Sequence, residues 1–314
     1  MKIFTLLIIS TLALTTFAED VKPVQPEKYN GYGLPNTKFK KVSVAPKAHN
    51  PQGASRAEPK ETESIKKEDR GYSLGVDLSP TYSIQAEKHK DGSQTQFIYY
   101  ELNPWLQVGD YKFTGLFYYN QNLKEPSDQD WDDSVVFVNR KAWEPTKLLM
   151  LTPYLNFGLP LSKTSREKAL ITGTVGPSFA LGLNSKEIGL PQLTLIGSTG
   201  YTKMFTRSNL NSAGEANVNY RLRQKLTAAW ALTDSLAFKV RFQFDSVYDY
   251  DNYVTNAFLH FEQFEYKVND HLGLNLGHTN SNGLFNPETY ENNLKFYDKE
   301  SSEIYAGFTV SISY

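Results

Sequence analysis

Five basic residues recur at every second position in two neighbouring stretches of this sequence. Arg221, Arg223 and Lys225 share one face of the first stretch, and Lys239 and Arg241 share one face of the second. A short polar turn joins the two stretches, so antiparallel pairing would bring all five cations together. Like charges at such spacing repel one another unless acidic groups or anionic ligands neutralise them. The spacing therefore predicts either an anion-attracting surface or a network of ion pairs.

Acidic residues on other predicted strands are the candidate partners of these cations. They are Asp77, Glu101, Asp245 and Glu262. We expect Asp245 and Glu262 to line the same wall as the five basic residues. A water-filled space in front of that wall would favour anions, as charged linings do in channels. Pairing of the carboxylates with the cations would instead plug a narrow interior, and the sequence leaves both interpretations open.

The elements that carry these residues are predicted to be long β-strands. From residue 71 onwards, apolar residues alternate with small or polar ones, which is the period of a strand whose faces meet different surroundings. The first segment (72–85) and the last (303–314) show this most clearly. They exceed the usual strand length of about 5–6 residues and match tilted bilayer strands, which need about 9–11 residues in hydrocarbon. The remaining predicted strands are 98–108, 111–119, 135–143, 149–159, 171–183, 193–205, 218–230, 236–244, 253–268 and one that begins at 272.

The connections between these segments support a membrane barrel of about twelve strands. Connections after odd-numbered strands are polar and often long, whereas most of those after even-numbered strands are tight. This asymmetry and an even strand number are typical of bacterial transmembrane barrels. The fourth and tenth strands are the least regular, so ten or fourteen strands remain alternatives, and the tenth is expected to contain a bulge. Prolines within strands are also expected at bulges or near strand ends, and they are Pro80, Pro104, Pro153 and Pro177.

The first 70 residues differ in composition from the rest. Lys2, an apolar run at 3–14 and the small residues Thr16 and Ala18 predict a secretory signal peptide at 1–18. Residues 19–70 are rich in Pro, Lys and Glu and predict a disordered periplasmic leader. That leader is either a solvated segment or a tether to peptidoglycan. The chain has no cysteine, which excludes disulfides and thiol chemistry.

An exported chain with about twelve alternating segments resembles the outer-membrane β-barrel superfamily of Gram-negative bacteria. The outward residues of the last segment are similar to the signal that the barrel-insertion machinery reads, and they are Phe308, Val310, Ile312 and Tyr314. The resemblance implies a single transmembrane antiparallel up-and-down β-barrel at 71–314 in the outer membrane, with both termini periplasmic. It also implies contact with outer-membrane lipids, lipopolysaccharide and the insertion machinery. A secreted soluble barrel or sandwich with an apolar core is the structural alternative.

The expected function is a passive, porin-like channel for small solutes, with anions favoured by the basic wall. A non-conducting structural or adhesion barrel, acting through outer loops such as 286–300, is the second interpretation. The third is an enzyme, because the run from His278 to Gly283 is similar to the His-x-Ser-Asn-Gly motif of outer-membrane phospholipase A, with Asn292 or Asn293 as a third member. An extra residue before Ser281 turns it away from His278 unless a bulge intervenes, so no catalytic site is predicted.

No metal, cofactor or nucleic-acid site is predicted. Asp128, Asp130 and Asp132 alternate like the start of a calcium loop, but Asp133 and Asn139 stand where the EF-hand pattern needs Gly and Glu. The remaining histidines show no metal-ligand spacing. There is no phosphate loop and no nucleophile-elbow motif.

Overall fold

The computed structural model describes residues 71–88, 92–124, 129–284, 294–299 and 301–314. The predicted signal peptide (1–18) and leader (19–70) lie outside the described residues. No helix in the described ranges is long and apolar enough to cross a bilayer. The strands are β1 (Tyr72–Gln85), β2 (Gln96–Val108), β3 (Tyr111–Asn122), β4 (Gln129–Trp131), β5 (Ser134–Arg140), β6 (Trp143–Thr146), β7 (Leu149–Leu159), β8 (Ile171–Leu183), β9 (Leu193–Thr206), β10 (Val218–Ala231), β11 (Leu236–Asp249), β12 (Val254–Lys267), β13 (Leu272–Gly283) and β14 (Ser302–Ser313).

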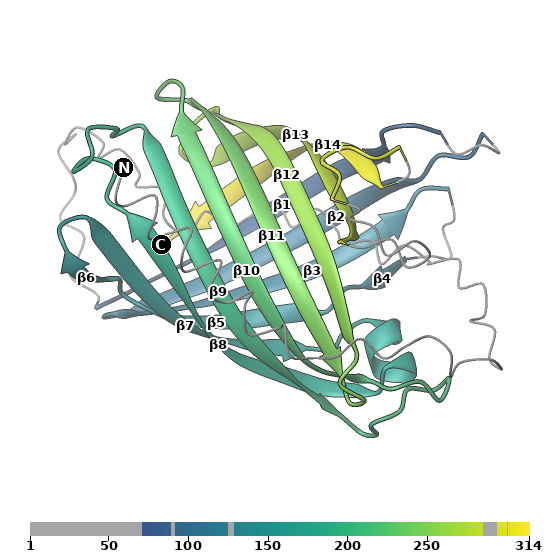
Figure 1. The fold of residues 1–314 in the computed structure, drawn as a ribbon. Helices are drawn as coiled ribbons and strands as arrows, with labels where there is room; N and C mark the ends of the chain where they lie inside the picture. Colours follow the sequence, from purple (N-terminus) through teal and green to yellow (C-terminus); the bar gives the residue numbers. More distant parts are fainter. Residues whose placement is uncertain (1–70, 89–91, 125–128, 285–293, 300) are drawn as a thin grey trace. The chain divides into compact units, whose positions relative to one another are not determined.

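The strands form a closed antiparallel barrel. Neighbouring strands in the wall follow one another in sequence (Figure 1). The ring closes because β1 pairs with β2 on one side and with β14 on the other. The short strands β4 and β6 extend β5, since β4 pairs with β3 and β6 pairs with β7. With β4–β6 counted as one position, the described wall has twelve strands, which confirms the predicted all-β up-and-down barrel.

The barrel carries its large apolar side chains on the outside. On β1, Leu78 is 43% exposed, whereas Thr81 and Ser83 on the opposite face are 2% and 0% exposed. The same contrast recurs around the ring, with exposed Leu226 on β10 and buried Lys239 on β11. A soluble barrel would bury its apolar face instead. The outward apolar belt therefore has the arrangement that a barrel surrounded by lipid requires.

Aromatic side chains gather on the outward face towards both ends of the strands. Tyr119 contacts the rings of Tyr100 and Trp131 near one end, with centroids 6.2 and 5.5 Å apart. Tyr72 and Trp143 lie near the other end and are more than half exposed. Amphipathic rings at two levels are the girdles expected at the two interfaces of a bilayer.

Two expectations about strand irregularity are wrong: the bulge in the tenth wall strand, and bulges or strand ends at three of the four prolines. The residue pairing of β12 with β11 and β13 runs without a shift, so the expected bulge in the tenth wall strand is not present. The register also continues unshifted past Pro80, Pro104 and Pro177, each of which lies inside its strand. At these prolines the pairing with one neighbour is locally interrupted, because proline has no N–H to donate to the ladder.

Candidate functional site: a basic wall inside the barrel

The five predicted cations lie together on the inward face of β10 and β11. Arg223 is opposite Asp245, and Thr227 is opposite Arg241, so the odd-numbered residues of both strands share one face. Exposed Leu222 and Leu226 occupy the other face. The tight connection from β10 to β11 sets this register. The sequence therefore brings all five cations onto one stretch of the interior wall.

Two of the five cations are neutralised by carboxylates. Arg223 holds Asp245 through two hydrogen bonds, from Nε to Oδ1 at 2.6 Å and from Nη2 to Oδ2 at 2.5 Å. Lys239 forms an ion pair with Glu265 on β12. Such bidentate and charge-assisted bonds fix both side chains in place. Asp245 thus lies where the sequence places it, as a partner within the wall.

The other three cations form no ion pair with any carboxylate of the described residues. Arg221 and Lys225 flank Arg223 on β10, and the Arg221 Nε is buried with no hydrogen-bond partner there. Arg241 donates from Nε to the Thr227 hydroxyl at 3.2 Å, and its guanidinium lies 4.8 Å from the ring centre of Phe261. The wall of β10–β12 therefore carries more positive than negative charge.

Glu262 does not line this wall, and its prediction as a lumen residue is wrong. It lies directly opposite His278, and its carboxylate oxygens are 3.3 Å from His278 Nδ1 and 3.8 Å from His260 Nε2. Exposed Phe264 and Tyr266 share its face of β12. Because β12 carries apolar residues on both faces, the sequence does not show which face is inward.

The inward acid on β12 is Glu265, which is not among the residues predicted from the sequence. It accepts hydrogen bonds from Lys239 and from Gln263. Tyr305 on β14 donates its hydroxyl to Gln263 Oε1 at 2.8 Å, and its ring occupies the space above Gly277. No alternation signal marked it as inward, because large apolar side chains lie on both faces of β12.

Small side chains form the inward face of β8 and β9 beside the basic wall. Ser178 lies opposite Gly200, and Ala180 lies opposite Ser198. The cations of β10 are the next row, since Arg223 pairs with Gly200 and Lys225 pairs with Ser198. Long basic side chains are therefore adjacent to a wall with little side-chain bulk.

The phospholipase-like motif does not assemble a catalytic site. The pairing of β13 with β12 is continuous through 277–283, so His278 faces outward and Ser281 faces inward. Asn292 and Asn293 lie outside the described residues. A nucleophile and base on opposite sides of a wall cannot exchange a proton directly.

Asp130 in the calcium-like segment and Asp133 beside it accept hydrogen bonds from backbone and hydroxyl groups. Asp130 accepts from the Lys163 N–H at 2.8 Å, and Asp133 accepts from the Ser162 N–H and hydroxyl at 3.1 and 2.9 Å. Asp128 lies outside the described residues. No group of three or more His, Asp or Glu side chains in the described ranges is arranged to hold a metal ion.

Comparison with known proteins shows the same fold. No protein-family model and no curated protein matches the sequence. The NanC porin structure superposes with a TM-score of 0.50 at 11% sequence identity, covering 75% of this chain and 98% of that chain. An outer membrane channel from Pseudomonas putida F1 gives 0.49 at 9% identity, covering 81% and 100%. The KdgM porin gives 0.42 at 7% identity, covering 75% and 99%. The chain has the fold of outer-membrane β-barrel porins.

Proposed function

We propose that this protein is a passive outer-membrane channel whose interior favours small anionic solutes. The observation that carries the proposal is the excess positive charge on the inner wall. Arg223 and Lys239 are neutralised, but Arg221, Lys225 and Arg241 have no ion-pair partner among the described carboxylates. Cations that line an aqueous pore raise the local concentration of anions and lower that of cations. The NanC porin has this fold, which supports a channel in general.

The test is ion selectivity in planar lipid bilayers. We expect the full-length protein, under a tenfold KCl gradient, to be more permeable to chloride than to potassium. The sign of the reversal potential reports this preference. The double variant Arg221→Gln/Lys225→Gln is expected to reduce that potential by half or more. Lys186→Gln, in the exposed connection between β8 and β9, is the matched control and leaves it unchanged. Cation preference in the wild type would overturn the anionic assignment.

A non-conducting structural or adhesion barrel is the second candidate, and the packing of the interior favours it. Four inward side chains of β1 are almost fully buried, and so are several on β11, β12 and β14. They are Ser79, Thr81, Ser83, Gln85, Lys239, Arg241, Gln263 and Tyr305. Small barrels fill their interior with side chains in this way. If correctly folded protein shows no conductance, the non-conducting barrel is the better assignment.

The location and partners of the barrel form part of the same proposal. The outward apolar belt supports contact with outer-membrane lipids and lipopolysaccharide. We assign both termini to the periplasm, with residues 19–70 as either a solvated leader or a tether to peptidoglycan. The outward face of β14 carries Phe308, Val310 and Ile312, with Tyr314 following, and is proposed as the segment that the insertion machinery reads. The proposal involves no enzymatic activity, cofactor or nucleic acid.

A further inference from the structure

The outward face of β12 and β13 carries polar side chains at the depth of the apolar belt. Glu262 lies directly opposite Val240, which is the middle of five outward apolar residues on β11. On its other side Glu262 is opposite His278, and His278 is opposite the exposed Ile304 of β14. A carboxylate and an imidazole at this level would face lipid on an isolated barrel. Ionisable groups on a lipid-facing surface are destabilising unless other protein groups cover them.

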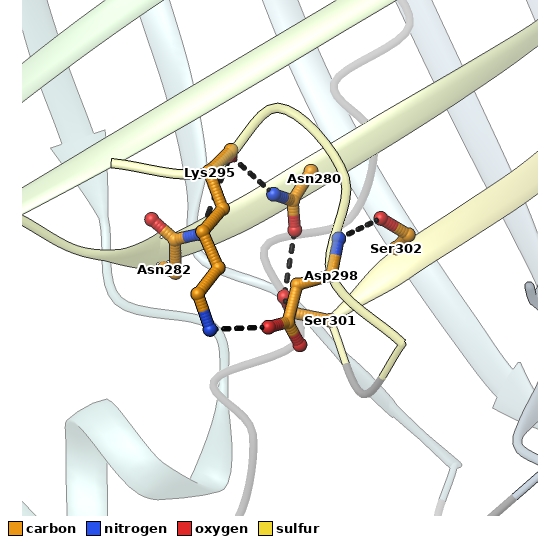
Figure 2. A network of polar contacts seen from close by, with 6 residues as sticks. All are labelled: Asn280, Asn282, Lys295, Asp298, Ser301 and Ser302. Carbon is orange, nitrogen blue, oxygen red and sulfur yellow. Dashed lines mark hydrogen bonds and ion pairs between the residues drawn. The ribbon is translucent and has the colours of Figure 1, made fainter. Parts of the chain in front are cut away.

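Part of this polar surface is covered by residues 294–299, which we call the strap. Figure 2 shows the Lys295 carbonyl above the amides of Asn280 and Asn282, which donate to it at 2.6 and 3.4 Å. Ser301 donates to the Asn280 side-chain oxygen at 2.6 Å. Asn280 is 0% exposed as a result, although it lies on the outside of the barrel wall. The strap thus supplies the hydrogen bonds that lipid would not supply.

Aromatic rings extend this cover towards β11 and β1. The Phe296 ring meets Phe242, Phe258 and His260 edge-on, with centroids 5.3–6.0 Å away. Tyr297 stacks on His278 at 5.9 Å and donates its hydroxyl to Glu87 at 2.8 Å. These contacts bury Phe258 and His260 on the outward face.

The cover stops short of Glu262. Its side chain remains 45% exposed between two histidines, and the His278 Nε2 is buried with no hydrogen-bond partner in the described chain. The strap also turns its own rings outward, since Phe296 and Tyr297 are 53% and 51% exposed. The exposed surface thus contains an apolar centre and one acid.

Two lysines lie on the same surface as the acid, so two copies of this surface can place opposite charges against each other. Lys295 and Lys299 on the strap have half or more of their side chains exposed. Lys295 pairs with Asp298, and Lys299 pairs with Glu87. Next to lipid, charges of this kind are stable only when another charged or polar group pairs with them. An isologous two-fold contact places one patch against a second copy of the same patch, so Glu262 would meet a lysine of the other copy. An apolar centre with a charged rim is the composition of a protein interface.

We propose that this face, formed by Glu262, His278, Phe296 and Tyr297, is the contact between two copies of the chain within the membrane. The second copy covers Glu262 and the strap rings, which removes the carboxylate from lipid. The proposal does not depend on whether the barrel conducts. It assigns the strap a role in assembly as well as in covering the wall.

The natural absence of cysteine gives a direct test. Glu262→Cys in the full-length protein is expected to form a disulfide-linked dimer when outer membranes are oxidised with copper phenanthroline. Leu155→Cys, on the outward face of β7 across the ring and 45% exposed, is the matched control and is expected to stay monomeric. Equal cross-linking of both variants, cross-linking of neither, or a product of another mass would overturn the proposal.

A second measurement needs no cysteine. The wild-type protein in mild detergent is expected to be dimeric by native mass spectrometry, and Glu262→Arg is expected to weaken the dimer at least tenfold by placing like charges together. A heat-dependent shift in gel mobility reports whether the variant barrel has folded. A monomeric wild type, or a folded Glu262→Arg variant with an unchanged dimer, contradicts the assignment.

Discussion

Arg223 on β10 and Asp245 on β11 lie opposite each other and form a bidentate ion pair on the inner wall, with both hydrogen bonds between 2.5 and 2.6 Å. The pair holds Arg223 against the wall between Arg221 and Lys225. It also places one negative charge within a row of positive ones. Asp245 therefore moderates the electrostatic field that the proposed channel presents to a solute.

Removing that negative charge is expected to make the channel more selective for anions. In Asp245→Asn, Arg223 loses its counter-charge, and the reversal potential under a KCl gradient should move further in the direction of chloride preference. The variant should also lose about 1–3 kcal/mol of stability against urea, because a hydrogen-bonded charge is left without its partner. Asp110→Asn, in the exposed turn between β2 and β3, is the control for the effect of one lost charge. A shift towards cations in Asp245→Asn would contradict this role.

The small inward residues of β8 and β9 lead to a prediction about conductance. Ser198 lies next to Lys225 across the β9–β10 pairing, on the inward face of β9. Ser198→Trp is expected to reduce single-channel conductance by half or more, because the indole fills the space in front of the unpaired cations. Phe179→Trp, on the exposed outward face of β8, should leave conductance unchanged. If the Ser198→Trp variant conducts as well as the wild type, the solute path does not pass Ser198.

The extent to which the sequence predicts this structure depends on how cleanly each strand alternates. β1 alternates without exception, and its expected range of 72–85 is confirmed. The fourth wall strand was expected to be weak, and it is divided among β4, β5 and β6. On β12, Phe258 lies outward and Phe261 inward, so alternation alone gives no assignment of faces, and Glu262 was placed on the wrong side.

The sequence predicts neither the position of the prolines within their strands nor the docking of the strap, for different physical reasons. A proline loses one ladder bond, but the other neighbour still fixes the register, so Pro104 stays inside β2 without a bulge. The strap is held by tertiary contacts such as Phe296 against Phe242, between residues far apart in sequence. No local pattern reports contacts of that kind. The five inward cations were predictable because both their strands alternate clearly and a tight turn joins them.

Gly277 is expected to be required for packing of the inner wall. A Cβ at this position would lie 2.5 Å from the Glu262 carbonyl oxygen and 2.6 Å from the Tyr305 ring. Since the carbonyl belongs to the backbone, Gly277→Ala should displace the wall locally and destabilise the barrel by about 1–3 kcal/mol, as overpacking does. Gly197→Ala is the matched control on another strand, because its Cβ would meet nothing within 4 Å. Urea unfolding measures the difference in stability between the two variants. Equal stability would show that the wall at Gly277 accommodates a methyl group at little cost.

Asn280 is expected to control how firmly the strap is held on the barrel. Its amide donates to the Lys295 carbonyl at 2.6 Å, whereas the corresponding bond from Asn282 is 3.4 Å long. Removing the shorter bond leaves the Lys295 carbonyl with only the longer one, so Asn280→Ala should release the strap more than Asn282→Ala does.

Proteolysis measures that release, because Lys295 and Lys299 are trypsin sites on the strap itself. Cleavage of intact protein in detergent should be at least tenfold faster in Asn280→Ala than in the wild type, with Asn282→Ala between the two. The gradation matters because general unfolding would expose lysines throughout the barrel, whereas a local opening exposes only these two. The masses of the tryptic fragments distinguish general unfolding from local opening of the strap. Faster cleavage confined to Lys295 and Lys299 would mean that one buried amide holds the strap closed, and unchanged cleavage would mean that the aromatic contacts of Phe296 and Tyr297 hold it without Asn280.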